Sequence, residues 1–590
     1  MSSFYTSVHK YGNNILFRGY DSKGNRIHER VKFKPTMFLP SKNSDSGWKA
    51  LDGSVVEPRQ FNSMKDAFEF SQRYEGVENF TIHGNTNFAS QFILEKYPDI
   101  IDYDYRKIRI GNIDIEVASD EGFPRPEEAN YPVISIAYRD SVNNIFNVWG
   151  MGDYDYTKCE LELNGAMIRY VKCRSEGELL QKFMIFWENN YPDIITGWNV
   201  RLFDIPYLIN RTTKICGEKT TKAISPWGIY QYRQITIMKK RLDAYEIYGV
   251  MQMDYMDLFQ KFGFSYGNQE SYSLDHISHV VLGESKLSYE DNHNLFKLLS
   301  SSEHVQYDSE RPIQELPKFQ QWARIRDKLR AEKLTRSKDS SLSCSFREDT
   351  LPLLDYTATE VDDLDLSTLT DGEVNRLLKH GEARADQEAY QLGIDYNIRD
   401  VDLVDRIDQQ TGLMELALVI AYKGGVNYPD AFGTTGIWDS ITYRYLAARN
   451  IAVPPNINKD RMDYGGGYVK DPRVGMVGWL ASFDLNSLYP NLIVQYNMSP
   501  ETLLRSVQQE SGVDHYLDHP ADPDAKERNF SVAANGSCYT KSKRGMLPDI
   551  IIKLYDERRL IKDGMLEAQS EYELLEQELK ELEMGVLHDG

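Results

Sequence analysis

The chain has 590 residues, and its 68 lysines and arginines against 89 aspartates and glutamates give a formal net charge of −21 at pH 7. At about 150 residues per domain, this length predicts roughly four domains with large cores. Apolar runs stay short of the roughly 18 residues of a membrane span, and the first residues lack a signal-peptide pattern, so neither membrane insertion nor secretion is expected. The acidic balance argues, on its face, against nucleic acid, because phosphate contacts need Lys and Arg.

The periodicity of apolar residues predicts strands mixed with helices along the chain. Residues 108–117 and 133–138 read as strands, whereas residues 178–191 have the spacing of an amphipathic helix. Nearer the C-terminus, residues 479–485 read as a strand, and residues 565–583 as a Glu-rich helix. The five cysteines are odd in number and widely spaced, which predicts neither a disulfide framework nor a zinc site.

One stretch differs from the rest in its charge. Lys and Arg dominate residues 318–338, whereas residues 347–388 hold 12 acidic and 4 basic residues. Segregated charge blocks are typical of a solvated loop or a helical excursion rather than of a site. We therefore expect a polar insertion at about 303–388, which contacts a partner or nothing.

Asp114 and Glu116 lie two residues apart in the first predicted strand, so both side chains project from the same face. Neighbouring carboxylates repel each other unless a cation neutralises them, and oxygen ligands of this kind suit Mg²⁺ or Mn²⁺. Isolated Asp-x-Glu tripeptides also occur on plain solvated strands, so that alternative stays open.

Two later segments add further acids. Asp204 follows a stretch with one Asn and two aromatic residues, Thr196-Gly197-Trp198-Asn199-Val200-Arg201-Leu202-Phe203. Tyr396 and Asp400 lie one helical turn apart on a shared face. Taken singly, Asp204 fits a helix cap and Tyr396 fits a core position.

These three segments, in this order, resemble the three exonuclease motifs of family B DNA polymerases, and the flanking sequence is most similar to the T-even bacteriophage polymerases. The flanking similarity includes Asp254-Tyr255-Met256-Asp257-Leu258 and Ser271-Tyr272-Ser273-Leu274-Asp275. The resemblance implies a 3′→5′ exonuclease that removes a mispaired nucleotide. It also implies that two Mg²⁺ ions, or Mn²⁺, are held by four acids: Asp114, Glu116, Asp204 and Asp400.

The same resemblance implies roles for residues around these acids. Tyr396 would orient the attacking water, and Lys286 would stabilise charge, although a plain surface lysine is an equal alternative. Phe123, Trp198 and Asn199 would hold the frayed primer end, where stacking and backbone contacts bind single strands without reading sequence.

A second set of motifs lies after residue 456. The segment from Asp484 to Pro490 resembles polymerase motif A of the family, which implies that Asp484 and the Leu485 carbonyl bind catalytic metals. The incoming nucleotide would contact Ser487, Leu488 and Tyr489, with Tyr489 excluding a 2′-hydroxyl. The glycines of Tyr464-Gly465-Gly466 allow close backbone approach, in this family to DNA, although a plain turn is the alternative. Asn491 departs from the family, which usually has serine there.

The helix predicted after Pro548 carries Arg558 and Lys562 on one face, while Ile551, Leu554 and Tyr555 form a buried face. The two cations suit a triphosphate clamp at the start of the family's fingers domain, and a salt-bridged surface helix is the alternative. The sequence contains neither an Asn-Ser-x-Tyr-Gly segment nor an Asp-Thr-Asp, which the family uses to complete its fingers and palm.

We therefore expect the N-terminal subunit of a split phage DNA polymerase, completed by a second polypeptide that carries the Asp-Thr-Asp motif and the thumb. The expected ligands are primer-template DNA, single-stranded DNA and dNTPs, with a sliding clamp bound through the second chain. The expected location is the cytoplasm of the infected host cell, with no membrane. The alternatives are an autonomous single-strand exonuclease, a truncated fragment, and a replisome scaffold or DNA-binding module.

The expected fold class is α/β multidomain. The domain boundaries that we predict comprise a mixed N-terminal domain (1–105), a ribonuclease H-like exonuclease domain (106–412), a return to the N-terminal domain or connector (413–455), a partial palm (456–545) and the first part of the fingers (546–590).

Overall fold

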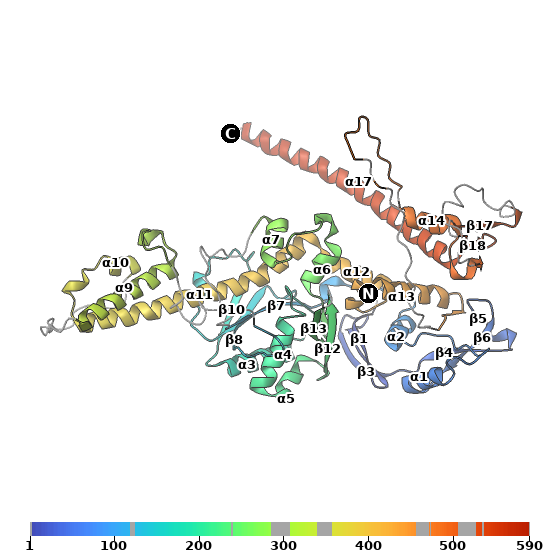
Figure 1. Ribbon diagram of the computed structural model, residues 1–590, viewed down its shortest axis with the longest axis horizontal. Helices are drawn as coiled ribbons and strands as arrows, with labels where there is room; N and C mark the ends of the chain where they lie inside the picture. Colours follow the sequence, from blue (N-terminus) through green and yellow to red (C-terminus); the bar gives the residue numbers. More distant parts are fainter. Residues whose placement is uncertain are drawn as a thin grey trace. The chain divides into compact units, whose positions relative to one another are not determined.

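The computed structural model describes residues 3–118, 124–237, 240–284, 307–338, 357–455, 471, 474–485, 487–505, 527–533 and 536–588. These residues form two compact units, each described here by itself (Figure 1). Unit 1 comprises residues 1–35, 61–68 and 87–441. Unit 2 comprises residues 36–60, 69–86 and 442–590.

A six-stranded sheet is the centre of unit 1, with the strand order β10-β9-β8-β7-β11-β14. The middle strands β7, β8 and β9 pair antiparallel, whereas β10, β11 and β14 join their neighbours in parallel. The strands are β7 (Ile110–Val117), β8 (Val133–Asp140), β9 (Ile145–Gly150), β10 (Met167–Lys172), β11 (Ile194–Thr196) and β14 (Met251–Gln252).

Helices cover both faces of this sheet (Figure 1). On one face, α3 (Glu176–Asn189) and α4 (Asp204–Cys216) pack against Ile113, Ile115 and Val117 of β7. On the other face, α11 (Asp371–Thr411) contributes Ile394, Ile398 and neighbouring residues to a second core. Because side chains alternate along β7, its acids lie on the α11 face.

Unit 1 also contains an N-terminal antiparallel sheet, a long hairpin and shorter helices. The sheet is β1 (Phe4–Tyr11), β2 (Asn14–Tyr20) and β3 (Arg26–Lys32), and the hairpin is β12 (Tyr230–Ile237) with β13 (Lys240–Ile247). The helices are α2 (Phe88–Lys96), α5 (Glu218–Thr221), α6 (Tyr255–Phe262), α7 (Leu274–Leu282) and α12 (Leu413–Gly424). Two helices cross the boundary between the units: α1 (Met64–Arg73) and α13 (Thr434–Ala447).

The insertion forms helices with a core of their own. In this part of unit 1, α9 (Lys318–Lys338), α10 (Ala358–Asp362) and the first half of α11 bury Trp322, Ile325 and Leu377. Basic residues of α9 pair with acidic residues of the later helices: Lys328–Asp362 at 3.2 Å, Arg330–Glu382 at 2.7 Å and Arg336–Asp371 at 3.0 Å. The described part of the insertion is therefore a helical excursion, and at least three ion pairs join its basic block to its acidic one.

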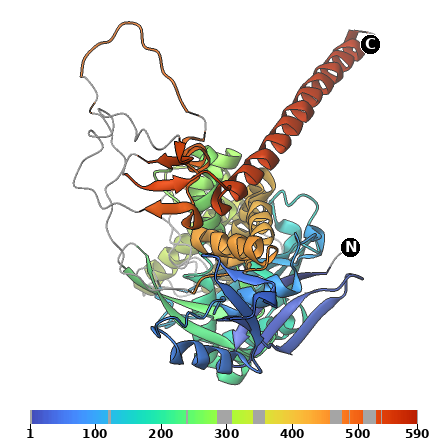
Figure 2. The same ribbon diagram turned by 90° about the vertical axis from the view of Figure 1, so that its right-hand side faces the viewer.

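Unit 2 has two small sheets and a long helix. One sheet, in the order β15-β5-β6-β4, contains β4 (Thr36–Pro40), β5 (Trp48–Ala50), β6 (Val55–Gln60) and β15 (Ile451–Ala452). The other contains β16 (Leu503–Arg505), β18 (Cys538–Thr540) and β17 (Phe530–Val532), drawn side by side in Figure 2. The helices are α14 (Leu488–Tyr496) and α17 (Met546–His588).

The α/β multidomain class is confirmed, as are the strands predicted near 108–117 and 133–138 and the helices predicted near 178–191 and 565–583. The strand predicted at 479–485 is wrong, because the described residues 480–485 are irregular and pair with no described strand. None of the helices described is both long enough and apolar enough to cross a membrane. The five predicted domain segments stay a prediction.

Candidate functional site

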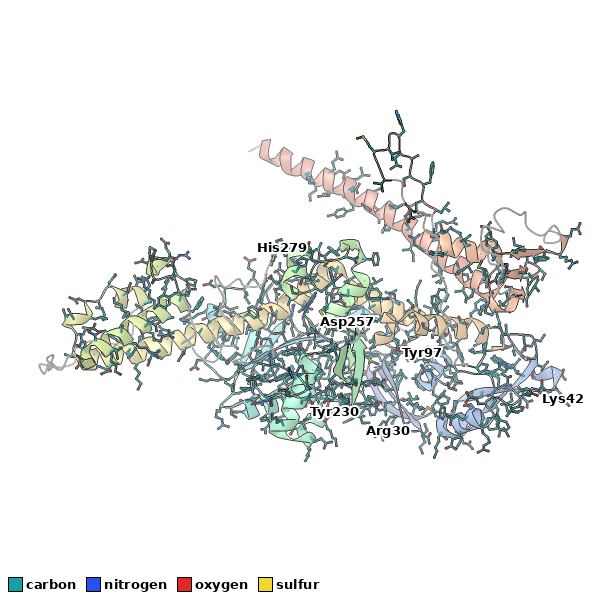
Figure 3. All side chains as sticks on the ribbon, in the orientation of Figure 1. Arg30, Lys42, Tyr97, Tyr230, Asp257 and His279 are labelled. Atoms are coloured by element: carbon teal, nitrogen blue, oxygen red, sulfur yellow. The ribbon has the colours of Figure 1, made fainter. Side chains whose placement is uncertain are left out.

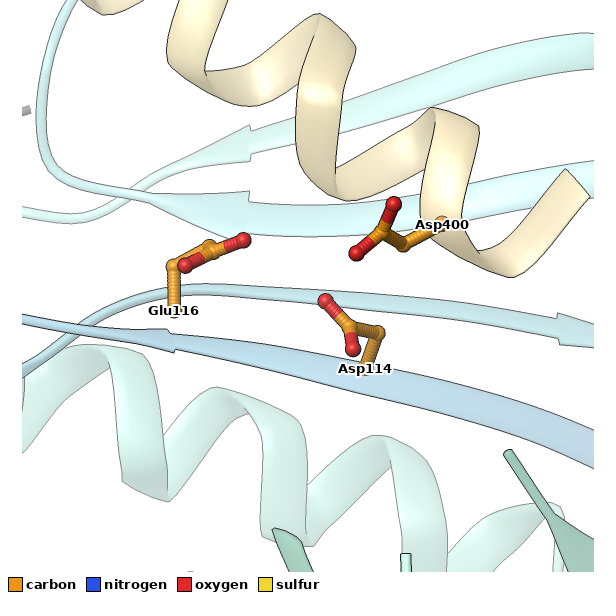
Figure 4. A group of neighbouring side chains, drawn as sticks. All are labelled: Asp114, Glu116 and Asp400. Carbon is orange, nitrogen blue, oxygen red and sulfur yellow. The ribbon is translucent and has the colours of Figure 1, made fainter. Parts of the chain in front are cut away.

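Three carboxylates converge between β7 and α11 in unit 1. Asp114 and Glu116 come from β7, and Asp400 comes from α11 (Figure 4). One oxygen from each lies within 4.8 Å of the others, and among the described residues this is the group of acids close enough to share a metal ion. Glu116 and Asp400 are buried, and Asp114 is half-buried. Carboxylates this close, largely out of water, are stabilised by a bound cation.

The donor set fits Mg²⁺ or Mn²⁺, because it consists of hard carboxylate oxygens with neither Cys nor His among them. The predicted juxtaposition of Asp114, Glu116 and Asp400 is thus present in the structure. Their role as metal ligands stays a prediction.

Asn397 holds the first of these acids in place. Its amide nitrogen donates to Asp114 Oδ2 at 2.6 Å, and its amide oxygen accepts from Ser135 Oγ at 3.0 Å. Both groups of the amide are therefore used, which fixes the orientation of the carboxylate. Sequence reasoning missed this residue, although it lies between Tyr396 and Asp400 in the third motif.

Asp204 lies beside the cluster. It is 2% exposed and begins α4, and its Oδ1 accepts a hydrogen bond from the Ile115 backbone N–H at 3.0 Å. Burial, and then the charge of Asp114, raises the pKa of Asp204 well above its ordinary value. Asp204 does not cap α4 with its side chain, because the cap position belongs to Phe203. The structure thus places the fourth predicted acid against the strand that carries the first two.

The structure describes three of the five other residues predicted for this site: Tyr396, Trp198 and Asn199. Tyr396 lies one turn before Asp400 on α11 and is half-buried. Trp198 donates from its indole N–H to the Tyr272 carbonyl at 3.0 Å, and its neighbour Asn199 has a left-handed backbone with φ of 65°. Phe123 and Lys286 lie outside the described residues, so their roles stay predictions.

The motif A segment in unit 2 is exposed. Asp484 and Leu485 lie in irregular, exposed chain, and Ser487 has a left-handed backbone just before α14. Leu488 and Tyr489 open that helix, where Tyr489 is 75% exposed. Tyr464, Gly465 and Gly466 lie outside the described residues.

Arg558 and Lys562 lie on the exposed part of α17, one turn apart. The buried face predicted beside them is only partly present. Ile551 and Tyr555 are half-buried, but Leu554 is 38% exposed. The side chain of Leu554 has too few neighbours among the described residues, so the expectation that it is buried is wrong.

Two family profiles match the chain. The profile described as "DNA polymerase family B, exonuclease domain" matches residues 80–277, and the one described as "DNA polymerase family B" matches residues 440–580. The first range contains three of the four predicted exonuclease acids, and the second contains the motif A segment.

Individual proteins match over most of the chain. A "DNA-directed DNA polymerase" of Escherichia phage RB69 is 28% identical across 99% of this chain and 56% of its own length. The enzyme of the same description from Enterobacteria phage T4 is 27% identical across 98% of this chain and 55% of its own length. A DNA polymerase delta catalytic subunit of Caenorhabditis elegans is 22% identical across 79% of this chain. The chain spans about half the length of the two phage relatives.

Proposed function

Because the chain belongs to the family B DNA polymerases, we propose that its unit 1 contains a 3′→5′ exonuclease that shortens the primer strand of DNA. The observation that supports this most directly is the group of three carboxylates within 4.8 Å of one another, with Asp204 hydrogen-bonded to the same strand. Acids held this closely suit phosphodiester hydrolysis, because the divalent cations that they would hold can offset the negative charge that develops on the reacting phosphate.

In this proposal Asp114, Glu116, Asp204 and Asp400 would hold two divalent cations, Mg²⁺ by preference. Bound there, the cations would activate the attacking water and stabilise the leaving 3′ oxygen. Asn397 keeps the Asp114 carboxylate turned toward its neighbours. Tyr396 orients the water from the adjacent turn of α11, and Lys286 stabilises charge on the phosphate. Phe123, Trp198 and Asn199 hold the single-stranded end.

We further propose that unit 2 supplies half of a polymerase site. Asp484 and the Leu485 carbonyl would bind metal, while Ser487, Leu488 and Tyr489 would contact the dNTP with Arg558 and Lys562. Exposed cations one turn apart on α17 support a triphosphate contact. The Tyr464-Gly465-Gly466 segment would lie along DNA.

Completion of that site is proposed to need residues outside this sequence, in the same polypeptide or in a second one. Exposed apolar residues of α17 support this proposal. Ile561, Met565, Tyr572, Leu575 and Leu579 follow one another at intervals of three, four or seven and are 56 to 67% exposed. Such a stripe is typical of a helix that packs on another helix. Those residues would supply the Asp-Thr-Asp motif, and with it the second metal-binding carboxylate of the polymerase site. They would also carry the contact with a sliding clamp.

The experiment incubates the chain with Mg²⁺ and 5′-labelled primer-template or single-stranded DNA. The expected result is stepwise 3′ shortening by the wild type and none by the Asp114→Ala, Asp204→Ala double variant. Shortening by both proteins would show that the cleavage does not require Asp114 and Asp204. Extension with dNTPs is expected only after a polypeptide with an Asp-Thr-Asp motif is added. Vigorous extension by the chain alone would contradict the incomplete polymerase site and favour a different source for the second acid.

A further inference from the structure

The loop formed by residues 197–203, called the 197–203 loop below, carries Trp198 and Asn199 and leads into Asp204. It lies directly against β7, because a Cβ added to Gly197 would stand 2.4 Å from the Ile113 carbonyl oxygen. Asn199 has a left-handed backbone, with φ of 65°, which non-glycine residues adopt at some cost. A loop of this shape needs contacts that hold it.

Asp254 makes those contacts. It is 2% exposed, and its Oδ1 accepts from the backbone N–H groups of Asn199 at 3.1 Å and Met256 at 3.0 Å. Its Oδ2 accepts from the Arg201 N–H at 2.9 Å. Two of these donors belong to the 197–203 loop, and the third lies in the first turn of α6. One buried carboxylate therefore joins the loop to a helix N-terminus, with N–H donors in place of water.

Residues next to Asp254 hold the same loop at further points. The Tyr255 N–H donates to the Gly197 carbonyl at 2.9 Å, and the Tyr255 ring lies 6.4 Å from the Trp198 ring at an angle of 29°. Asp257, labelled in Figure 3, pairs with Arg201 at 2.7 Å. The loop is thus fastened along its length to the segment 254–257.

Asp204 has an anchor of its own. Its Oδ1 accepts from the Ile115 N–H on β7, a donor that Asp254 does not share, although the charge of Asp254 adds to the rise in the pKa of Asp204. Loss of the Asp254 contacts should therefore disturb the start of the loop more than the acid at its end. We therefore expect the affinity for DNA to depend on Asp254 more strongly than the chemical step does.

We propose that Asp254 is a positioning residue for the single-stranded 3′ end. It acts through the backbone of Asn199 and Arg201, which fixes the 197–203 loop in the conformation that presents Trp198 and Asn199 to DNA. The proposal rests on the exonuclease function proposed above and adds a residue that touches neither DNA nor metal.

The test is Asp254→Asn, which keeps the shape of the side chain but turns an NH₂ donor toward a backbone N–H. Loss of one or two such bonds corresponds to about a tenfold rise in Kd. Kd is measured by fluorescence anisotropy with a labelled 12-nucleotide oligothymidylate without divalent ions. The rate is measured in single turnover at saturating DNA with Mg²⁺, and we expect it to fall less than the affinity.

Two variants serve as controls. Asp257→Asn breaks the partly exposed pair with Arg201 but leaves the three N–H bonds to Asp254, so its Kd should rise much less than that of Asp254→Asn. Asp114→Ala should cleave nothing, so any cleavage in its sample reveals a contaminating nuclease. If the wild type fails to cleave, the exonuclease proposal fails, whereas the Kd comparison still reports on Asp254.

The proposal is overturned if Asp254→Asn binds DNA with the wild-type Kd. It is also overturned if the rise in Kd is fully explained by the fraction of unfolded protein that a lowered melting temperature produces. Should Asp254→Asn fail to fold, Gly197→Ala decides, because its Cβ pushes the same loop off β7. A folded Gly197→Ala variant with raised Kd supports the proposal, and one with wild-type Kd overturns it.

Discussion

Asn397 belongs to the candidate metal site although it carries no charge. The amide bridges Ser135 on β8 and Asp114 on β7, so it couples two strands to the helix that supplies Asp400. A carboxylate with one oxygen fixed in this way presents the other in a defined direction. Partners of this kind commonly affect metal affinity nearly as strongly as the ligands do.

We expect Asn397→Leu to lower exonuclease activity or apparent Mg²⁺ affinity by about 10- to 100-fold, because Asp114 loses its donor. The measurement is a Mg²⁺ titration of the single-turnover rate. Ser135→Ala is the matched control, because it removes the contact one step further away and should cost less. An unchanged Mg²⁺ midpoint in Asn397→Leu would show that the amide does not orient Asp114.

The four acids could be named together from the sequence because their three segments resemble motifs of the family, but Asn397 could not. Strand alternation places Asp114 and Glu116 on one face, and helical spacing places Asp400 one turn after Tyr396. The role of Asn397 depends on which strand lies opposite its helix, and spacing along one element does not contain that information. The same is true of Asp254, whose partners Asn199 and Arg201 in the 197–203 loop lie more than fifty residues away in sequence.

At the scale of elements, α11 connects the insertion to the site. Its first half packs in the core of the insertion, and its second half covers the sheet. Polar contacts hold the second half. Asn112 donates to the Val401 carbonyl at 2.8 Å, and Arg139 pairs with Asp405 at 2.8 Å.

Glu284, just after α7, forms ion pairs with two arginines of this helix. It pairs with Arg399 at 2.6 Å, directly before Asp400 in the chain, and with Arg406 further along α11. The hydrogen bond from Arg406, with a further one from Arg399, lowers the pKa of Glu284 below its ordinary value of 4.5, although burial opposes this shift. The folded state therefore favours the charged carboxylate more than the unfolded chain does.

Because the pKa of Glu284 is lowered on folding, its stabilisation is fully present above pH 4.5 and is lost as the pH falls through the folded-state pKa. We expect Glu284→Gln to lower Tm by about 1–3 °C at pH 7, a small value because the pair is partly exposed. The difference in Tm between the variant and the wild type should shrink toward pH 3. It is measured by thermal unfolding followed by circular dichroism.

Glu160→Gln is the control for this prediction, since Glu160 forms a long, exposed pair with Lys318 at 3.8 Å. It should change Tm little at either pH. A difference in Tm between Glu284→Gln and the wild type that stays constant between pH 7 and pH 3 would show that the charge of Glu284 does not stabilise the fold.

Elements with strong periodicity were predictable, and the failures have a physical cause. The apolar run at 479–485 has strand composition, but a strand also needs a ladder partner, and the described residues offer none. Its side chains are exposed instead, with Trp479 and Phe483 almost fully accessible. The charge blocks of the insertion predicted solvated structure, yet only the fold reveals that they pair with each other.

At the scale of the whole molecule, the net charge of −21 does not describe the surface that DNA would meet. The insertion uses at least three of its cations in internal pairs, with Lys328, Arg330 and Arg336 each bound to an acid. Exposed cations lie elsewhere, for example at Lys541, Lys543 and Arg544 before α17. Local arrangement therefore decides which basic residues can contact phosphates.

The salt dependence of DNA affinity can test this distribution, because each phosphate contact to a single strand contributes about −0.7 to the slope of log K against log salt. We expect no change in slope when the three insertion pairs are neutralised on both sides, with Lys328, Arg330 and Arg336 changed to Gln together with Asp362→Asn, Glu382→Gln and Asp371→Asn. Glu332→Gln is added, because Glu332 also pairs with Arg336 at 2.7 Å.

The comparison is a variant with Lys541→Gln, Lys543→Gln and Arg544→Gln, whose slope should become shallower because exposed cations are removed. Neutralising both partners of a pair leaves no uncompensated charge behind, so the insertion variant should stay folded. Three phosphate contacts correspond to a change in slope of about 2. If the slope of the insertion variant becomes shallower by that amount, Lys328, Arg330 and Arg336 contact DNA in spite of their internal ion pairs.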